Sequence, residues 1–219
     1  MKFGLLVRKE CWTLSWRGRL LIFGLAIVFG MVLQWEAYPF LAVNHLVDAD
    51  VLVVEGWVDE PFLNQAAAEF QLGHYRQLLL AREDYAPGAQ YHYEPGPSSH
   101  EYKAGLLVQY GVPHNAIGVL TYPAFERDRT YHTALAVKKW FAEREAPVRF
   151  NIATEAAHAR RSWLLFSKAF GNTAAIGIVA LRSSEFDPQH WWNTSQGVRT
   201  VIGEEIAYVY AKLFFVPNS

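Results

Sequence analysis

The residues with the clearest chemical potential in this chain of 219 residues lie between positions 154 and 162. His158 and Arg161 are three residues apart, so a helix places them on one face. The apolar run 148–153 is typical of a strand, and we expect the helix to begin near His158. The unbonded N–H groups and the dipole of a helix N-terminus attract anions. A helix N-terminus next to a titratable imidazole and a guanidinium predicts an anion site with acid–base chemistry. An arginine pair that only caps a helix is the alternative.

Further polar candidates lie where neighbouring predicted elements end or begin. Glu55 ends a buried apolar strand, where an acid is costly unless it is paired, for example with Arg161, or binds a ligand. Thr130 and Thr133 open another helix, and they either face the anion or cap that helix. We take His158 and Glu55 as the catalytic candidates. The ligand-binding candidates from these patterns are Gly56, Trp57, Glu101, Thr130, His132, Thr133 and Arg161.

The composition argues against several classes of function. The formal net charge is −1, which gives no support to a basic nucleic-acid-binding face. A single cysteine, Cys11, rules out an intrachain disulfide and a cysteine-based zinc site. The eight histidines form no His-x-x-x-His pair, so we expect no metal, and no Gly-x-Ser-x-Gly elbow of a serine hydrolase is present. The cofactor, if there is one, is not identified by these patterns.

The first forty residues differ from the rest of the chain. Five basic residues precede or begin an uncharged run at 20–33, and tryptophans stand at both ends of it. This order predicts a cytoplasmic segment 1–15 and a single membrane-spanning helix 16–38, with the remaining chain on the outer side of the inner membrane. A cleaved signal peptide and a buried core helix are the alternatives, but no small-x-small cleavage pattern follows the run.

Strand-like and helix-like segments alternate regularly beyond this helix. The expected strands are 51–54, 77–81, 117–120, 148–153 and 175–181, with helices between them and a last helix carrying Ile202, Ile206, Val209 and Leu213 on one face. We expect mainly a loop at 83–97, and a helix that opens at Ser98 and Ser99. Such alternation predicts one α/β domain, residues 48–219, that is three-layered and Rossmann-like with a mainly parallel sheet. Ligands bind beyond the carboxyl ends of such strands, where most of the candidates fall.

Six short motifs, in this order, resemble those of the YdcF/SanA/ElyC-like proteins. They are residues 50–56, 99–101, 110–113, 129–134, 154–161 and 204–208. The resemblance covers roughly residues 48–212, and its most specific part is Thr154-Glu-Ala-Ala-His-Ala-Arg-Arg161. It implies a Rossmann-like domain on a membrane anchor with a role in the bacterial envelope, in which cell-wall precursors or the lipid carrier are handled. It also adds Glu204 to the ligand-binding candidates.

These observations lead to three hypotheses about function. In the first, the domain is an envelope enzyme, a hydrolase or transferase that acts on a phosphorylated, anionic or lipid-linked precursor through His158 and Glu55. In the second, the domain binds such an anionic small molecule without converting it. In the third, the domain is structural, and Glu55 and Arg161 only pair with each other. The expected partners are the lipid bilayer and the anionic ligand.

Overall fold

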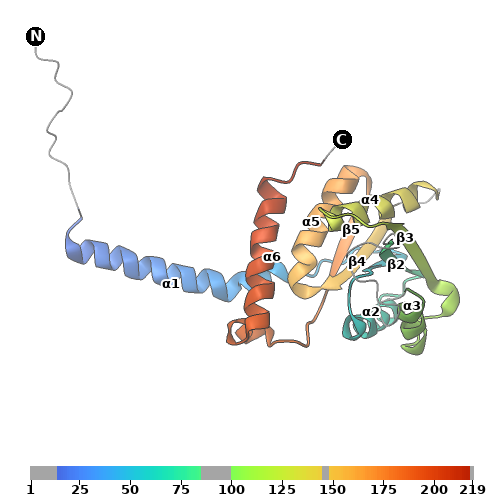
Figure 1. The fold of residues 1–219 in the computed structure, drawn as a ribbon, viewed down its shortest axis with the longest axis horizontal. Helices are drawn as coiled ribbons and strands as arrows, with labels where there is room; N and C mark the ends of the chain where they lie inside the picture. The colour runs from blue at the N-terminus through green and yellow to red at the C-terminus, as the bar shows by residue number, and fades with distance from the viewer. Residues whose placement is uncertain (1–13, 85–99, 145–147, 218–219) are drawn as a thin grey trace, which may run out of the picture. The chain divides into compact units, whose positions relative to one another are not determined.

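The computed structural model of the chain describes residues 14–84, 100–144 and 148–217 (Figure 1). Nearly all of the predicted segment 1–15, the predicted loop beyond residue 84, and Ser98 and Ser99 at the predicted helix start lie outside these ranges. The chain divides into two compact units, Met1–Glu36 and Ala37–Ser219. The larger unit therefore begins upstream of residue 48.

An apolar helix, α1 (Trp16–Leu41), occupies the place of the predicted membrane span. Its mean hydropathy reaches 1.9 over an 18-residue window, and it is long enough to cross a bilayer. A signal sequence close to the N-terminus would have the same length and composition. The prediction of one long apolar helix is thus confirmed, and its last turn, from Ala37, belongs to the larger unit.

Five parallel strands form the centre of the larger unit, in the spatial order β3-β2-β1-β4-β5. The strands are β1 (Val51–Glu55), β2 (Gln77–Asp84), β3 (Ile117–Pro123), β4 (Arg149–Glu155) and β5 (Ala175–Leu181). All four strand pairs are parallel. The predicted α/β class with a parallel sheet is confirmed, and the strand order is consistent with a Rossmann-like fold.

Helices cover both faces of this sheet (Figure 1). One face carries α2 (Glu60–Leu72) and α3 (His100–Gln109), and the other carries α4 (Arg129–Ala142) and α5 (Ala159–Phe170); α6 (Ser195–Leu213) packs against α5. Successive residues of β1 enter different cores: Val53 packs on the α4–α5 side and Leu52 on the α2–α3 side. A strand buried on both faces must be apolar throughout, which explains the unbroken β-branched run that marks β1 in the sequence.

Two strands are longer than the sequence pattern predicts. β2 continues through Asp84 and β3 through Pro123, although residues 83–84 were expected in a loop. The extension is polar, with Glu83 opposite Tyr122 across the ladder. Its backbone is paired even though its side chains do not form an apolar pattern. This extension carries Glu83 to the edge of the sheet where ligands are expected.

The segment before β1 lies along the outer edge of β5. His45 exchanges two backbone hydrogen bonds with Ile178, and the Asn44 side chain accepts one from the Ala180 N–H. Asn151 of β4 is buried and bonds Val47 through both its amide nitrogen and its oxygen. The approach is so close that a Cβ at Gly177 would lie 1.7 Å from the Asn151 oxygen. The chain entering the domain is therefore fixed to the sheet.

Candidate functional site

A cavity of about 760 Å³ opens at the carboxyl ends of the strands. Its lining includes Gly56 and Trp57 just after β1, Arg82 and Glu83 near the end of β2, and Glu155 at the end of β4. The floor of the cavity is therefore the sheet edge that was predicted to bind ligands. From β1 the chain adds strands first on one side, β2 and β3, and then on the other, β4 and β5. Clefts at such topological switch points bind ligands in open α/β sheets. Its walls come from the first residues of α4 and from α5 and α6.

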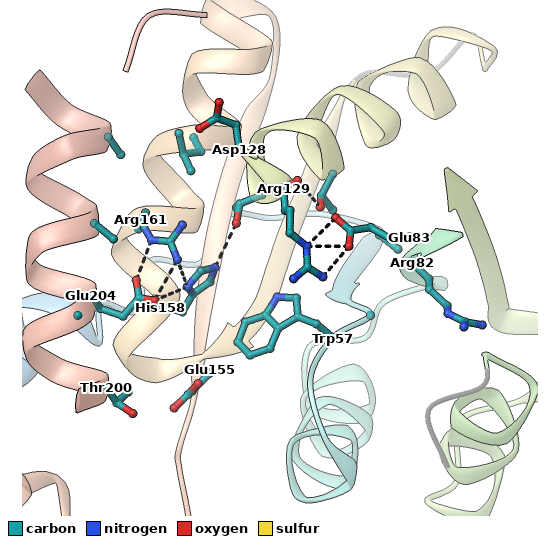
Figure 2. Close-up of a pocket in the computed structure, with 18 of the residues that line it drawn as sticks. Trp57, Arg82, Glu83, Asp128, Arg129, Glu155, His158, Arg161, Thr200 and Glu204 are labelled. Carbon is teal, nitrogen blue, oxygen red and sulfur yellow. Dashed lines mark hydrogen bonds and ion pairs between the residues drawn. The ribbon is translucent and has the colours of Figure 1, made fainter. Parts of the chain in front are cut away.

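His158 lies in this cavity with both of its ring nitrogens next to protein groups (Figure 2). Its Nδ1 lies 3.0 Å from Glu204 Oε1 and 2.8 Å from Arg161 Nη2. A protonated Nδ1 donates to Glu204, and an unprotonated Nδ1 accepts from Arg161, so each tautomer has a partner on this side. The proton can therefore reside on either ring nitrogen, and Nε2 is able to act as an acceptor or as a donor.

The Nε2 side of the ring faces two groups deeper in the fold. Thr130 Oγ1 lies 3.4 Å away, and Glu55 Oε2 lies 3.7 Å away. Glu55 is almost fully buried, and its Oε2 accepts a hydrogen bond from Ser162. Its Oε1 has no hydrogen-bond partner in the described part of the chain, and neither does Thr154 Oγ1 on the adjacent strand. Glu55 thus stands behind the cavity with acceptor capacity toward His158.

Arg161 is paired with Glu204 and not with Glu55. Its Nε and Nη2 donate to the two carboxylate oxygens of Glu204 at 2.8 and 2.9 Å, a bidentate geometry. The possible Glu55–Arg161 pair is therefore wrong, and the structural hypothesis loses its main support because a cavity is present. With its guanidinium neutralised, Arg161 serves to orient Glu204 and His158 more than to hold an anion alone.

The loop after β1 forms the wall next to the histidine. The edge of Trp57 packs against the His158 ring, with 5.0 Å between centroids, and its indole is partly exposed. Gly56 is required where it stands, because its N–H bonds Ala81 O at 2.6 Å and a Cβ would meet that oxygen at 2.5 Å. Lys103 of α3 holds this loop, since its Nζ donates to the carbonyls of Gly56 and Val58. Burial lowers the pKa of Lys103 below its usual range.

A second ion pair lies across the cavity from the histidine. Arg129, at the first position of α4, donates from Nε to both carboxylate oxygens of Glu83, which Figure 2 draws as dashed lines. Thr133 is bonded to the Tyr122 hydroxyl at 2.7 Å and donates to the Arg129 carbonyl. The start of α4 is thereby fixed over the end of β2. This pair was not among the sequence predictions.

Two carboxyl groups of the cavity have pKa values shifted in opposite directions. Burial raises the pKa of Glu155, and the nearby Glu204 carboxylate adds to this while His158 opposes it. Burial would also raise the pKa of Glu204, but hydrogen bonds from Arg161 and His158 outweigh it and lower the pKa to about 2. Environments that shift two carboxyl groups in opposite directions are typical of sites that assign them different roles. Glu204 is suited to support a protonated His158, because it stays ionised.

The structure brings together most of the predicted residues, but not all of them. Residues lining the cavity are Gly56, Trp57, Thr130, Thr133, His158, Arg161 and Glu204. Glu101 is exposed in the first turn of α3 and is not part of the lining. His132 also lies outside it and stacks on Phe125 at 3.5 Å between centroids. These two residues face away because their helices turn neighbouring positions toward the cavity.

Three important residues were missed by sequence reasoning. Glu155 stands two residues after the last residue of the predicted strand 148–153, so its place near a strand end was a usable signal. Glu83 was assigned to a loop, which hid its position at the end of β2. Lys103 gave no signal, because a lysine within a helix is usually solvated. Among the described residues, no group of three or more His, Cys, Asp or Glu is placed to hold a metal ion.

The shifted pKa of Glu204 predicts a specific loss of stability in acid. A carboxyl group with a lowered pKa stabilises the fold above its unfolded value of 4.5 and loses this contribution as the pH falls through about 2. The contribution is about 3 kcal/mol at neutral pH. We expect Glu204→Gln to remove it, so that urea unfolding from pH 6 to pH 2 shows a shallower decline than the wild type. Glu143→Gln, on an exposed side chain outside the cavity, is the control for loss of one carboxylate. If the free energy of unfolding of Glu204→Gln fell with pH as steeply as that of the wild type, the prediction would be contradicted.

Comparison of the sequence with models of known protein families finds no match, and comparison with curated proteins finds none either. The resemblance to the YdcF/SanA/ElyC-like proteins therefore stays a prediction that rests on its six motifs. The function has to be argued from the cavity itself.

Proposed function

We propose that the chain is a membrane-anchored enzyme that transfers or hydrolyses a phosphoryl-type group on an anionic precursor of the bacterial envelope. The observation that carries this proposal is the environment of His158. Its Nδ1 has a partner in either tautomer, while Nε2 lies beside Thr130, which lines the cavity, and Glu55, which stands behind it. A histidine held in this way is suited to general acid–base catalysis.

In the proposed reaction, two groups divide the proton transfers. His158 Nε2 accepts the proton of the attacking water or hydroxyl as its oxygen forms a bond to phosphorus. Glu155 gives its proton to the departing oxygen as the older P–O bond breaks. The ionised Glu204 stabilises the imidazolium that forms, as the acid of a catalytic triad does. The N-terminus of α4, at Arg129 and Thr130, supplies N–H groups and a dipole for the phosphoryl oxygens.

The charge of the cavity limits the kind of substrate. Five basic and six acidic side chains belong to its lining, and Arg129 and Arg161 are each held by a carboxylate. A polyanion would meet repulsion in such a lining. The mixture favours a substrate with one compact anionic group and a larger neutral part. Trp57 offers that neutral part a flat surface, as aromatic side chains do for sugar rings.

The anchor is part of the same proposal. We place α1 across the inner membrane with the N-terminus in the cytoplasm and the domain outside. This is supported by the uncharged helix and by the basic residues, including Arg17 and Arg19, that cluster at its N-terminal side. Trp35, an exposed tryptophan near the other end of α1, is suited to the interface between lipid and water.

The experiment uses two glycines that are open for a side chain. Gly203 lines the cavity and Gly105 lies on α3 outside its lining, and neither has a neighbouring atom within 4 Å of an added Cβ. The full chain in detergent is tested with p-nitrophenyl phosphate, farnesyl diphosphate and UDP-N-acetylglucosamine. We expect phosphate or alcohol release and a raised melting temperature with at least one probe, since a ligand at 100 times its Kd stabilises by about 2.7 kcal/mol.

Gly203→Leu should abolish both effects while the melting temperature without a probe is kept or raised, and Gly105→Leu should leave both effects unchanged. A melting-temperature shift without conversion of any probe would favour the second hypothesis, a binding module. No effect of any probe, or equal effects in both variants, would refute a function of this cavity in phosphoryl chemistry.

A further inference from the structure

The outer side of α6 is an apolar face that stays exposed among the described residues of the larger unit. Ile206 and Leu213 are 67% and 69% exposed, and Phe214, just beyond the helix, is 67% exposed. At 100° per residue Ile206 and Leu213 lie about 20° apart around the helix. The α6 apolar face, as we call it, consists of Val198, Ile206, Val209, Tyr210, Leu213 and Phe214.

The opposite side of α6 carries the contacts to the domain. Gly197, Val201 and Ala211 are buried there, and Glu204 reaches the cavity from this side. Three residues of the predicted apolar stripe face outward, whereas Ile202 packs against the cluster around Val201. Contiguous exposed apolar surfaces mark interaction sites on soluble domains.

The end of α1 lies directly against α6. Phe40 packs edge-on against Tyr208, with 5.4 Å between ring centroids. Arg160 of α5 lies 4.0 Å over the Phe40 ring and donates a hydrogen bond to the Phe40 carbonyl. These contacts fall within one compact unit, Ala37–Ser219. Because residues 37–41 are the last turn of the apolar helix α1, the chain enters the larger unit next to α6.

We propose that the α6 apolar face lies in the outer leaflet of the same bilayer that α1 spans. This rests on the anchor of the proposed function and adds a second membrane contact to it. A helix with one apolar face and basic groups near it lies in the interface plane, with that face among the acyl chains. Arg199 lies at the N-terminal end of the face, from where a long side chain reaches the headgroups. The lipid is favoured over a second copy because the membrane exit is adjacent and connected by the chain itself.

This placement brings the cavity to the lipid surface. Tyr210 belongs both to the α6 apolar face and to the cavity lining, and Ala207, Ala211 and Phe215 continue the lining as an apolar wall. The cavity thus has a polar side at His158 and an apolar side at α6. A substrate with a hydrocarbon part is able to enter from the leaflet without leaving lipid.

The test uses the full chain in nanodiscs of phosphatidylcholine, with Cys11 replaced by serine. A nitroxide label is attached at Ile206→Cys or Leu213→Cys, and at Leu72→Cys as the control. Leu72 is 77% exposed at the end of α2, on the other face of the sheet. None of the three residues lines the cavity.

We expect labels at 206 and 213 to collide at least threefold more with oxygen than with a water-soluble nickel chelate, relative to the label at 72. Equal chelate accessibility at all three positions would overturn the proposal. Protection from both reagents with dipolar broadening between labels would also overturn it, because the face would then be an interface between two copies. The probe assays are run on the same samples, so a failed membrane contact with intact conversion, or the reverse, separates this proposal from the proposed function.

Discussion

His158→Gln is expected to lower kcat by about 10²–10⁴-fold on a probe that the wild type converts, because it removes the proton acceptor at Nε2. The glutamine amide keeps a donor for Glu204, so the melting temperature should change little. The pH dependence of kcat/KM should lose the limb that belongs to the imidazole. Phosphate release at saturating probe and thermal unfolding are the two measurements.

His132→Gln is the matched control for this variant. His132 was a candidate in the sequence, but it stacks on Phe125 outside the cavity. Its replacement should leave kcat within about twofold, as expected for a residue that does not touch the reacting atoms. Equal losses in the two variants would mean that the loss reflects stability and not proton transfer. Retention of activity in His158→Gln would refute the assigned role.

The second large effect is expected in the core, at Phe150. This residue of β4 is fully buried, and its ring lies 5.2 Å from that of Phe141 and 5.1 Å from that of Phe170. Truncation of such a phenylalanine costs about 3–5 kcal/mol, since transfer energy is lost and a cavity remains. Phe150→Ala should therefore lower the melting temperature by roughly 10 °C for a domain of this size.

The free energy of unfolding in urea is measured for Phe150→Ala and for the control variant Leu72→Ala. Leu72 is exposed at the end of α2, and its truncation should change the free energy of unfolding by less than about 0.5 kcal/mol. If Phe150→Ala costs no more than Leu72→Ala, the aromatic cluster between β4, α4 and α5 is not the centre of the core.

The sheet could be predicted because its strands are short apolar runs separated by helices. β1 and β5 are mainly apolar segments, and such strands are stable only when helices cover both faces of the sheet. The ends of β2 and β3 could not be predicted in the same way. Glu83 is polar, and its strand conformation comes from pairing with Tyr122, a partner far away in the sequence.

For the site, local spacing found the helix residues but not their partners. His158 and Arg161 share one turn of chain, so three-residue spacing was sufficient to place them together. The choice of Glu204 over Glu55 as the partner of Arg161 depends on how α6 packs against α5. Glu204 and Glu205 are also adjacent in sequence, and periodicity alone does not separate them. Spacing also did not show that Glu101 lies outside the cavity lining, since only packing decides which side of α3 faces the cavity.

The hydrogen bonds that residues 44 and 45 make along the edge of β5 have a consequence for proteolysis between α1 and β1. A protease that cut just before the first strand would release the sheet without residues 44 and 45, which hold the backbone of Ile178 and Ala180. The released fragment would then display a bare β-strand edge to its neighbours, and such edges join between molecules. Cleavage at this point would therefore lead to self-association of the released domain, so residues 44 and 45 protect the sheet edge as well as joining α1 to the domain.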